Sequence, residues 1–174
     1  MPDGWLINEV VWDEANGIQI EPSPKDLIAL IAMKRKKKVD VSNDLRKLLE
    51  ATLKEICHSC KVKMDFRYND QNERRMNGEL LSELKSTINR RSAELKDNKI
   101  FSNLEGSNLV ATVGSHDNAE KITEGDIDIA LSDIMQLRGL FSCSECGRHV
   151  EAARQVSGKN RIACKCGHKE LDWK

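Results

Sequence analysis

Apolar residues recur at intervals of three and four over most of the chain, and this spacing places them on one face of a helix. The clearest stretch is VSNDLRKLLEATLKEICHSC, in which Ser42 or Asn43 can cap the start. Its apolar face consists of Leu45, Leu48, Leu49, Leu53 and Ile56. Further helical stretches are expected to begin near Pro24, Glu79, Lys99 and Thr123. The pattern predicts a mainly α fold, a bundle of four to five helices.

Two features mark ends within these helical stretches. Gly106 lies in the middle of KIFSNLEGSNLVATV and is expected to interrupt the helix there, because glycine is a poor helix former. Thr123 and Asp126 in TEGD form a capping-box pattern, which predicts the start of a last helix that ends at Leu140 and Phe141.

The first residues have a different pattern. WLINEVVW is a short apolar run, Asn16-Gly17 is turn chemistry, and IQIE alternates, so a β-hairpin is expected. Pro22 and Pro24 then separate this segment from the first helix. We therefore expect three parts: a hairpin over residues 1–22, a helical bundle over 23–141 and a small β module over 142–174.

The composition limits the classes of protein to consider. With 174 residues, 39% hydrophobic and 32% charged, the chain has apolar material for one core. It contains no run of about 18 apolar residues and begins without a secretory leader pattern, so we expect a cytoplasmic protein with no membrane span. In a reducing compartment, six cysteines indicate metal ligands or free thiols rather than disulfides.

Four of the cysteines form two close pairs near the end of the chain. The first pair is Cys143 and Cys146 in FSCSECGRHV, and the second is Cys164 and Cys166 in ACKCGHKELDWK. A glycine follows each pair at once, as a tight metal-binding turn requires. The 17 residues between the pairs suit a zinc ribbon, although the second pair has one intervening residue instead of two. The spacing predicts a structural Zn²⁺ bound by these four thiolates.

Two histidines leave an alternative ligand set open. His168 follows the second pair and can replace one of its cysteines, and His149 is a weaker candidate. Cys57 and Cys60 also have the spacing of a metal-binding turn. They lack a second half-site, so they are interpreted as buried or half-buried free thiols.

Charge is unevenly distributed although the net charge is zero. From Ser23 to Lys63 there are eleven Lys/Arg against five Asp/Glu, about +6, and from Ser102 to Phe141 two against seven, about −5. The two segments either pack on each other or serve two partner surfaces.

A run of five cations is either a solvated helix end or a patch that contacts phosphates. It consists of Lys34, Arg35, Lys36, Lys37 and Lys38. Further cations would aid such a patch if they share its face, namely Lys61, Lys63, Arg74, Arg75, Arg90 and Arg91. The apolar residues of the hairpin are more than one short hairpin can bury by itself. Two of them, Trp5 and Trp12, are candidate residues for docking on another protein.

The order of elements over residues 42–141 resembles the HEPN-type helical bundle. The charged helix LRKLLEATLKEI, the stretch GSNLVATVGSHDN and the capped final helix carry the resemblance. Catalytic members of that family cleave RNA without a metal, using an arginine and a histidine. Here Asn108 and His116 match the motif in part, and Ser107 stands at the position of the arginine, so the resemblance implies a non-catalytic relative.

A helical bundle with a terminal zinc ribbon also resembles accessory components of bacterial antiphage defence systems of the Lamassu type. Those components accompany an SMC-like ATPase or a nuclease. The resemblance implies a non-catalytic accessory subunit with a larger protein partner and with nucleic acid near its basic face. The alternatives are a metal-independent HEPN-type ribonuclease acting through His116 and a zinc-ribbon regulator that binds nucleic acid.

Overall fold

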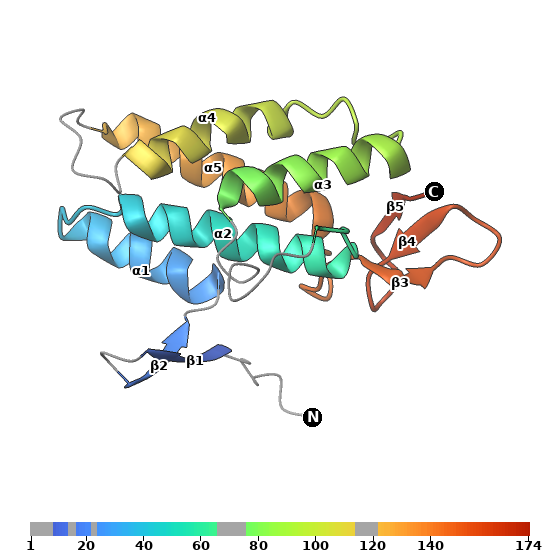
Figure 1. Cartoon of the computed structure of the whole chain (residues 1–174), viewed down its shortest axis with the longest axis horizontal. Coiled ribbons are helices and arrows are strands. Elements are labelled where there is room, and N and C mark those ends of the chain that lie inside the picture. Colours follow the sequence, from blue (N-terminus) through green and yellow to red (C-terminus); the bar gives the residue numbers. More distant parts are fainter. Residues whose placement is uncertain (1–8, 14–16, 22–23, 66–75, 114–121) are drawn as a thin grey trace.

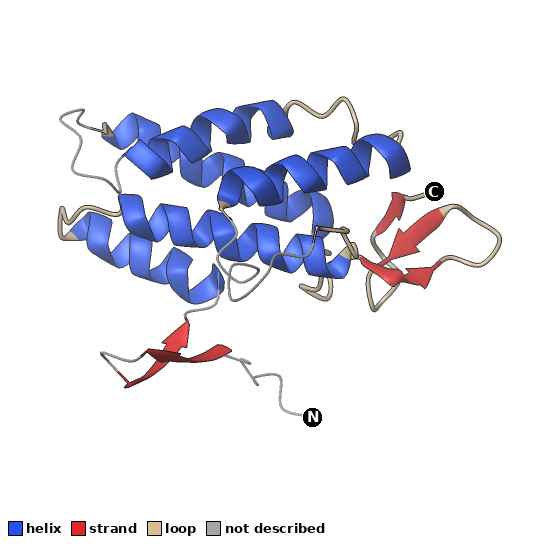
Figure 2. Cartoon of the chain, in the orientation of Figure 1, coloured by secondary structure: helices blue, strands red, loops and turns tan. Residues whose placement is uncertain are grey.

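The computed structural model describes residues 9–13, 17–21, 24–65, 76–113 and 122–174, with the backbone alone described in 9–13, 17–21, 24 and 109–113. Among these residues five helices form a bundle, with one small antiparallel sheet before them in the chain and another after them (Figures 1 and 2). In chain order the elements are β1 (Glu9–Asp13), β2 (Gly17–Glu21), α1 (Pro24–Lys36), α2 (Ser42–Ser59), α3 (Asn77–Arg91), α4 (Ile100–Val113), α5 (Glu124–Phe141), β3 (Glu151–Gln155), β4 (Arg161–Ala163) and β5 (Glu170–Asp172). The prediction of a mainly helical chain is confirmed.

Helix α2 lies at the centre of the bundle. It contacts α1, α3, α4 and α5, and Figure 1 shows it running the length of the bundle. The apolar face expected from its sequence is completely buried, at 0% exposure for Leu45, Leu48, Leu49, Leu53 and Ile56. Removing such side chains from water is the main favourable contribution to folding, about 1.5–3 kcal/mol each.

The other helices cover α2 with apolar faces of their own. Buried leucines and isoleucines at helical spacing face inward from α1, α3 and α5. They are Leu27 and Ile31 on α1, Leu80, Leu81, Leu84 and Ile88 on α3, and Ile127, Ile134 and Leu137 on α5. Phe141, the last residue of α5, is fully buried at the point where the helix meets the C-terminal module.

The start of α5 is capped as the sequence predicts. The Thr123 hydroxyl accepts from the Asp126 backbone N–H at 3.2 Å, and the Asp126 carboxylate accepts from the Thr123 N–H at 2.9 Å. The start of α2 is different. Neither Ser42 nor Asn43 is the cap: Ser42 is already helical, and its N–H and hydroxyl donate to the Asp40 carboxylate at 3.2 and 2.8 Å. The Asp40 carboxylate therefore accepts from Ser42 itself, whereas a capping Ser42 would have accepted from the N–H of a residue two or three positions later.

Helix α4 is not interrupted at Gly106, contrary to the expectation from sequence. It continues from Ile100 to Val113 through the glycine. No side chain would meet a Cβ at this position within 4 Å. The packing of α4 along α5 keeps the helix regular and outweighs the glycine's cost of about 1 kcal/mol.

The C-terminal module, residues 142–174, is a three-stranded antiparallel sheet in the order β3-β4-β5 (Figure 2). In the register of β4 and β5, Ile162 lies opposite Leu171. Val150, Ile162, Leu171 and Trp173 are buried and belong to one hydrophobic cluster with the helices. The module therefore shares a core with the bundle.

At the other end of the chain, β1 and β2 pair antiparallel, with Val10 opposite Ile20 and Trp12 opposite Ile18. These strands correspond to the expected hairpin. None of the helices described is both long enough and apolar enough to cross a lipid bilayer.

Candidate metal centre

Two tight turns bring the four C-terminal cysteines together. In the first turn the Gly147 N–H donates to the Cys143 carbonyl at 2.9 Å, and in the second the Gly167 N–H donates to the Cys164 carbonyl at 3.1 Å. Both glycines have the left-handed conformation, with φ of 65° and 79°. A side chain with a Cβ would be strained there, which explains why a glycine follows each pair.

The four sulfur atoms have the separations that a metal ion needs. The Sγ atoms of Cys143, Cys146, Cys164 and Cys166 all lie within 4.8 Å of one another. Cys166 Sγ is 3.6 Å from Cys143 Sγ and 3.4 Å from Cys164 Sγ, and all four thiols are free. A tetrahedral zinc with Zn–S bonds of about 2.3 Å would separate its sulfurs by about 3.8 Å. The cluster is therefore close enough to hold a metal ion and compatible with zinc.

Backbone N–H groups point at the sulfurs and favour their anionic form. Burial raises the pKa of Cys164, but the Lys169 N–H, which donates to its sulfur at 3.3 Å, and the neighbouring thiols lower that pKa to about 6. The Arg148 N–H lowers the pKa of Cys146 in the same way. Thiolates at neutral pH are the form that binds a metal.

Cys166 differs from Cys146 and Cys164 in that its pKa is raised. The His168 backbone N–H lowers the pKa of Cys166, but hydrogen bonds with Cys146 and Cys164 outweigh it and raise the pKa to about 12. Cys166 is exposed, whereas Cys143 and Cys164 are buried. Binding of a metal would displace the proton from this exposed thiol.

The histidines predicted as alternative ligands are not part of the sulfur cluster. Within the described part of the chain, the group of side chains close enough to share a metal ion consists of the four cysteines alone. His168 is exposed on the second turn. His149 contacts other partners: its Nδ1 lies 3.0 Å from the Ser142 hydroxyl, and its Nε2 lies 3.1 Å from the Glu55 carboxylate.

His149 thereby links the first cysteine turn to the bundle. Ser142 and His149 form a β-bridge on either side of the turn, and Glu55 lies on α2. Arg138 of α5 also contacts the Glu55 carboxylate, at 3.0 Å. Burial raises the pKa of Glu55, but His149 and Arg138 together outweigh it, and the pKa falls below its usual value of 4.5. A polar contact between three segments thus holds the turn in place.

Trp173 forms the second link between the module and the bundle. Its side chain is 3% exposed, and the Arg91 guanidinium lies 6.0 Å from its ring centroid. Beside it, the Lys174 N–H donates to the Arg91 carbonyl at 2.8 Å, and the Ala93 N–H donates to the Asp172 carboxylate at 3.0 Å. Neither Trp173 nor β5 was expected from sequence. The alternation of Leu171 and Trp173 was the available signal, but three residues are too few for a periodicity.

Cys57 and Cys60 are free buried thiols, as expected. Burial raises the pKa of each to about 12. The Cys57 thiol donates weakly to the Leu80 carbonyl at 3.8 Å. Protonated thiols inside the core act as small apolar side chains.

The basic run at the end of α1 is partly neutralised within the chain. Lys34 pairs with Asp44 at 2.8 Å, and Arg35 pairs with Glu124 and Asp128 of α5 at 3.0 and 2.7 Å. The basic and acidic segments therefore do contact each other. Lys36, Lys37 and Lys38 are exposed.

Among the residues that the structure describes, the other cations proposed for the same patch do not extend it. Lys61 and Lys63 follow the opposite end of α2, which spans about 27 Å at 1.5 Å per residue. Arg90 and Arg91 end α3 at the side of the module (Figure 1). Several predicted site residues lie outside the described part of the structure, namely Arg74, Arg75, His116, Trp5 and the side chain of Trp12. The nucleic-acid and docking roles of these residues stay predictions.

Comparison with protein-family models, curated proteins and solved structures finds no match to this chain. The resemblance to HEPN-type bundles and to defence-system components therefore stays a prediction. Two residues of the compared motif, Ser107 and Asn108, lie on α4. Ser107 is buried, and its hydroxyl donates to Asp133 of α5 at 2.7 Å.

Proposed function

We propose that this chain is a non-catalytic accessory subunit, in which a zinc ion bound by four cysteines fixes a zinc-ribbon module on a helical bundle that docks on a larger protein. The convergence of four sulfur atoms within 4.8 Å supports this proposal. A zinc ion with four thiolate ligands has no open position for water or substrate, so its role is to stabilise a fold. A structural metal suits this position, where the small C-terminal sheet joins the helical bundle.

The position of Ser107 favours the non-catalytic form over the ribonuclease alternative. An arginine that stabilises a transition state must reach solvent and the scissile phosphate. Ser107 is 4% exposed and hydrogen-bonded to Asp133 between α4 and α5. The residue at the position of the catalytic arginine thus serves the packing of two helices.

The setting is proposed from the resemblance alone. A bacterial antiviral assembly built on an SMC-like ATPase or a nuclease is the environment in which such an accessory subunit would work, in the cytoplasm. Contact with DNA would use Lys36, Lys37 and Lys38 and the zinc ribbon, and would weaken steeply as salt is added.

The test is a native pull-down of the tagged chain from its own host, with mass spectrometry of the bound proteins and a nuclease-treated control. Recovery of an ATPase or nuclease in a fixed ratio would support the accessory role. Recovery of the chain alone, or with RNA that disappears in the control, would reject it. Cleavage of RNA that is lost in His116→Ala would support the ribonuclease instead.

A further inference from the structure

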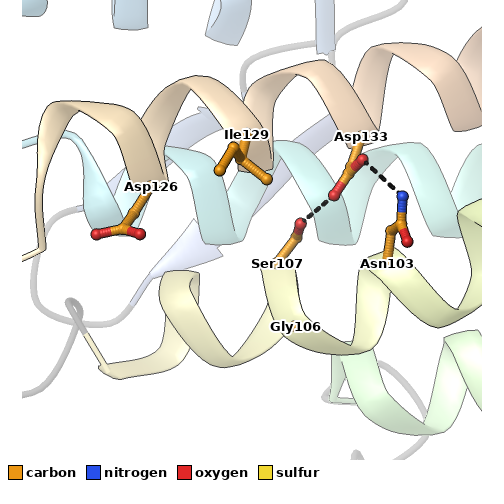
Figure 3. A pocket seen from close by; sticks show the side chains of 6 residues that line it. All are labelled: Asn103, Gly106, Ser107, Asp126, Ile129 and Asp133. Atoms are coloured by element: carbon orange, nitrogen blue, oxygen red, sulfur yellow. Dashed lines mark hydrogen bonds between the residues drawn. The ribbon is translucent and has the colours of Figure 1, made fainter.

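An open groove lies between α4 and α5, on the face of the bundle drawn in Figure 3. Its volume is about 310 Å³, and its lining residues are Asn103, Gly106, Ser107, Asp126, Ile129 and Asp133. Gly106 contributes no side chain, and no atom lies within 4 Å of where a Cβ would be. The volume is at the lower end of ligand pockets, about 300–1,000 Å³, which is room for one long side chain.

Asp133 at the base of the groove has unused capacity to accept hydrogen bonds. It is 5% exposed, and the Ser107 hydroxyl donates to its Oδ2 at 2.7 Å. The Asn103 amide reaches Oδ1 only at 3.5 Å, the limit of a hydrogen bond (Figure 3). A carboxylate offers about four acceptor positions. Within the described residues no Lys or Arg lies at ion-pair distance from Asp133, whereas the less buried Glu55 has both Arg138 and His149.

On the α5 side of the groove an apolar side chain lies between two acidic ones (Figure 3). Asp126, Ile129 and Asp133 follow one another at intervals of three and four residues and so share a face of α5. Asp126 lines the groove, and its pKa is lowered by hydrogen bonds from the Thr123 hydroxyl and N–H. Ile129 is 62% exposed at the groove. A long cationic side chain could pack its aliphatic part on Ile129 and place its charge at Asp133.

We propose that this groove binds a single lysine or arginine side chain from the partner protein. A buried carboxylate is costly unless it is paired, and a cation from the partner would complete its hydrogen bonds. Charge complementarity selects this occupant, because two of the six residues that line the groove are acidic and none of the six is basic. The inference rests on the proposed docking function. It adds the site at which the partner binds and the ion pair that would hold it.

The test uses the full chain, prepared with zinc, and NMR titration with Nα-acetyl-arginine amide and Nα-acetyl-lysine amide. Nα-acetyl-citrulline amide, which has nearly the shape of the arginine amide without its charge, is the control ligand. At least one cationic amide should shift the backbone amide signals of Asn103, Ser107 and Ile129, and citrulline amide should leave them in place. In Asp133→Asn the dissociation constant should rise about tenfold or more. The matched control is Asp97→Asn, at an acid whose side chain is 88% exposed, and its affinity should stay unchanged.

Ile129→Arg provides a second variant, at an exposed position where the fold is not at risk. The new guanidinium would lie at the groove beside Asp133, so binding of the amide should be lost while the spectrum stays folded. Shifts that citrulline amide reproduces, or equal affinity of wild type and Ile129→Arg, would overturn the proposal even if Asp133→Asn fails to fold. The pull-down separates the two proposals. If Ile129→Arg still recovers the partner, the accessory role stands and the groove is rejected as its binding site. If the groove binds the arginine amide but wild type recovers no partner, the accessory role fails although the groove binds a cation.

Discussion

Replacing Cys143 by serine should release zinc and unfold the C-terminal module while the helices persist. Cys143 is 3% exposed and supplies one of four sulfurs. A complete structural zinc site contributes about 10–16 kcal/mol to folding. One ligand in four thus corresponds to about 2.5–4 kcal/mol, and zinc affinity should fall by roughly a hundredfold to a thousandfold. When the metal is lost, the buried side chains of the module would lose their packing; they are Val150, Ile162, Leu171 and Trp173.

Trp173 offers a direct readout of this change. In a Trp5→Phe, Trp12→Phe background it is the one tryptophan left, and its emission should move to longer wavelength in Cys143→Ser or after chelation. Zinc bound per chain, measured by mass spectrometry, should fall from one toward zero. The helical signal in circular dichroism should change little, because the core around α2 is formed by the helices themselves.

Cys57→Ala is the matched control, because Cys57 and Cys60 have the same pair spacing and lie in the core without a role in the cluster. This variant should keep one zinc per chain and an unchanged Trp173 emission. The reasoning would be refuted if wild type contained no zinc when purified from zinc-supplied cells. A Trp173 emission that does not respond to complete removal of the metal would refute it as well.

Three further changes test other parts of the structure. Phe141→Ala should lower the free energy of unfolding by about 3–5 kcal/mol in urea titrations, because the ring is fully buried where α5 meets the module. Ser107→Ala should cost about 1–3 kcal/mol by the same measurement, since it leaves Asp133 without its close hydroxyl donor. Glu55→Gln should reduce the dependence of stability on pH below about 4.5. The folded-state pKa of Glu55 lies below its usual 4.5, so its contribution is present above that pH and is lost as the pH falls through the lowered value. A variant whose thermal unfolding between pH 3 and 5 matches wild type would contradict this role.

Long periodic segments were predictable from the sequence because local spacing alone decides which face is apolar. The central helix α2 and the capped helix α5 illustrate this. The cysteine cluster was predictable for a related reason, since pair spacing and the following glycine determine a turn without tertiary information. The expected break at Gly106 was wrong because packing of α4 on α5 outweighs a single residue's propensity.

Contacts between distant segments were beyond sequence reasoning. The groove depends on Ser107 and Asp133, which lie 26 residues apart on two helices. The link through Glu55 and His149 joins residues 94 apart. The residue type alone suggested a metal ligand for His149, and only the fold shows that the ring faces a carboxylate. The start of α2 differed because the Asp40 carboxylate accepts from both the N–H and the hydroxyl of Ser42, so the serine lies inside the helix and its side chain acts as a donor.

The central position of α2 has a consequence for hydrogen exchange. A helix that contacts four others cannot open unless they separate from it, so its amides should exchange with solvent only when the whole chain unfolds. Helices at the edge of the bundle can open by smaller fluctuations, which require less free energy. The slowest amide protons around Leu48 and Leu49 would therefore report the global free energy of unfolding without any denaturant.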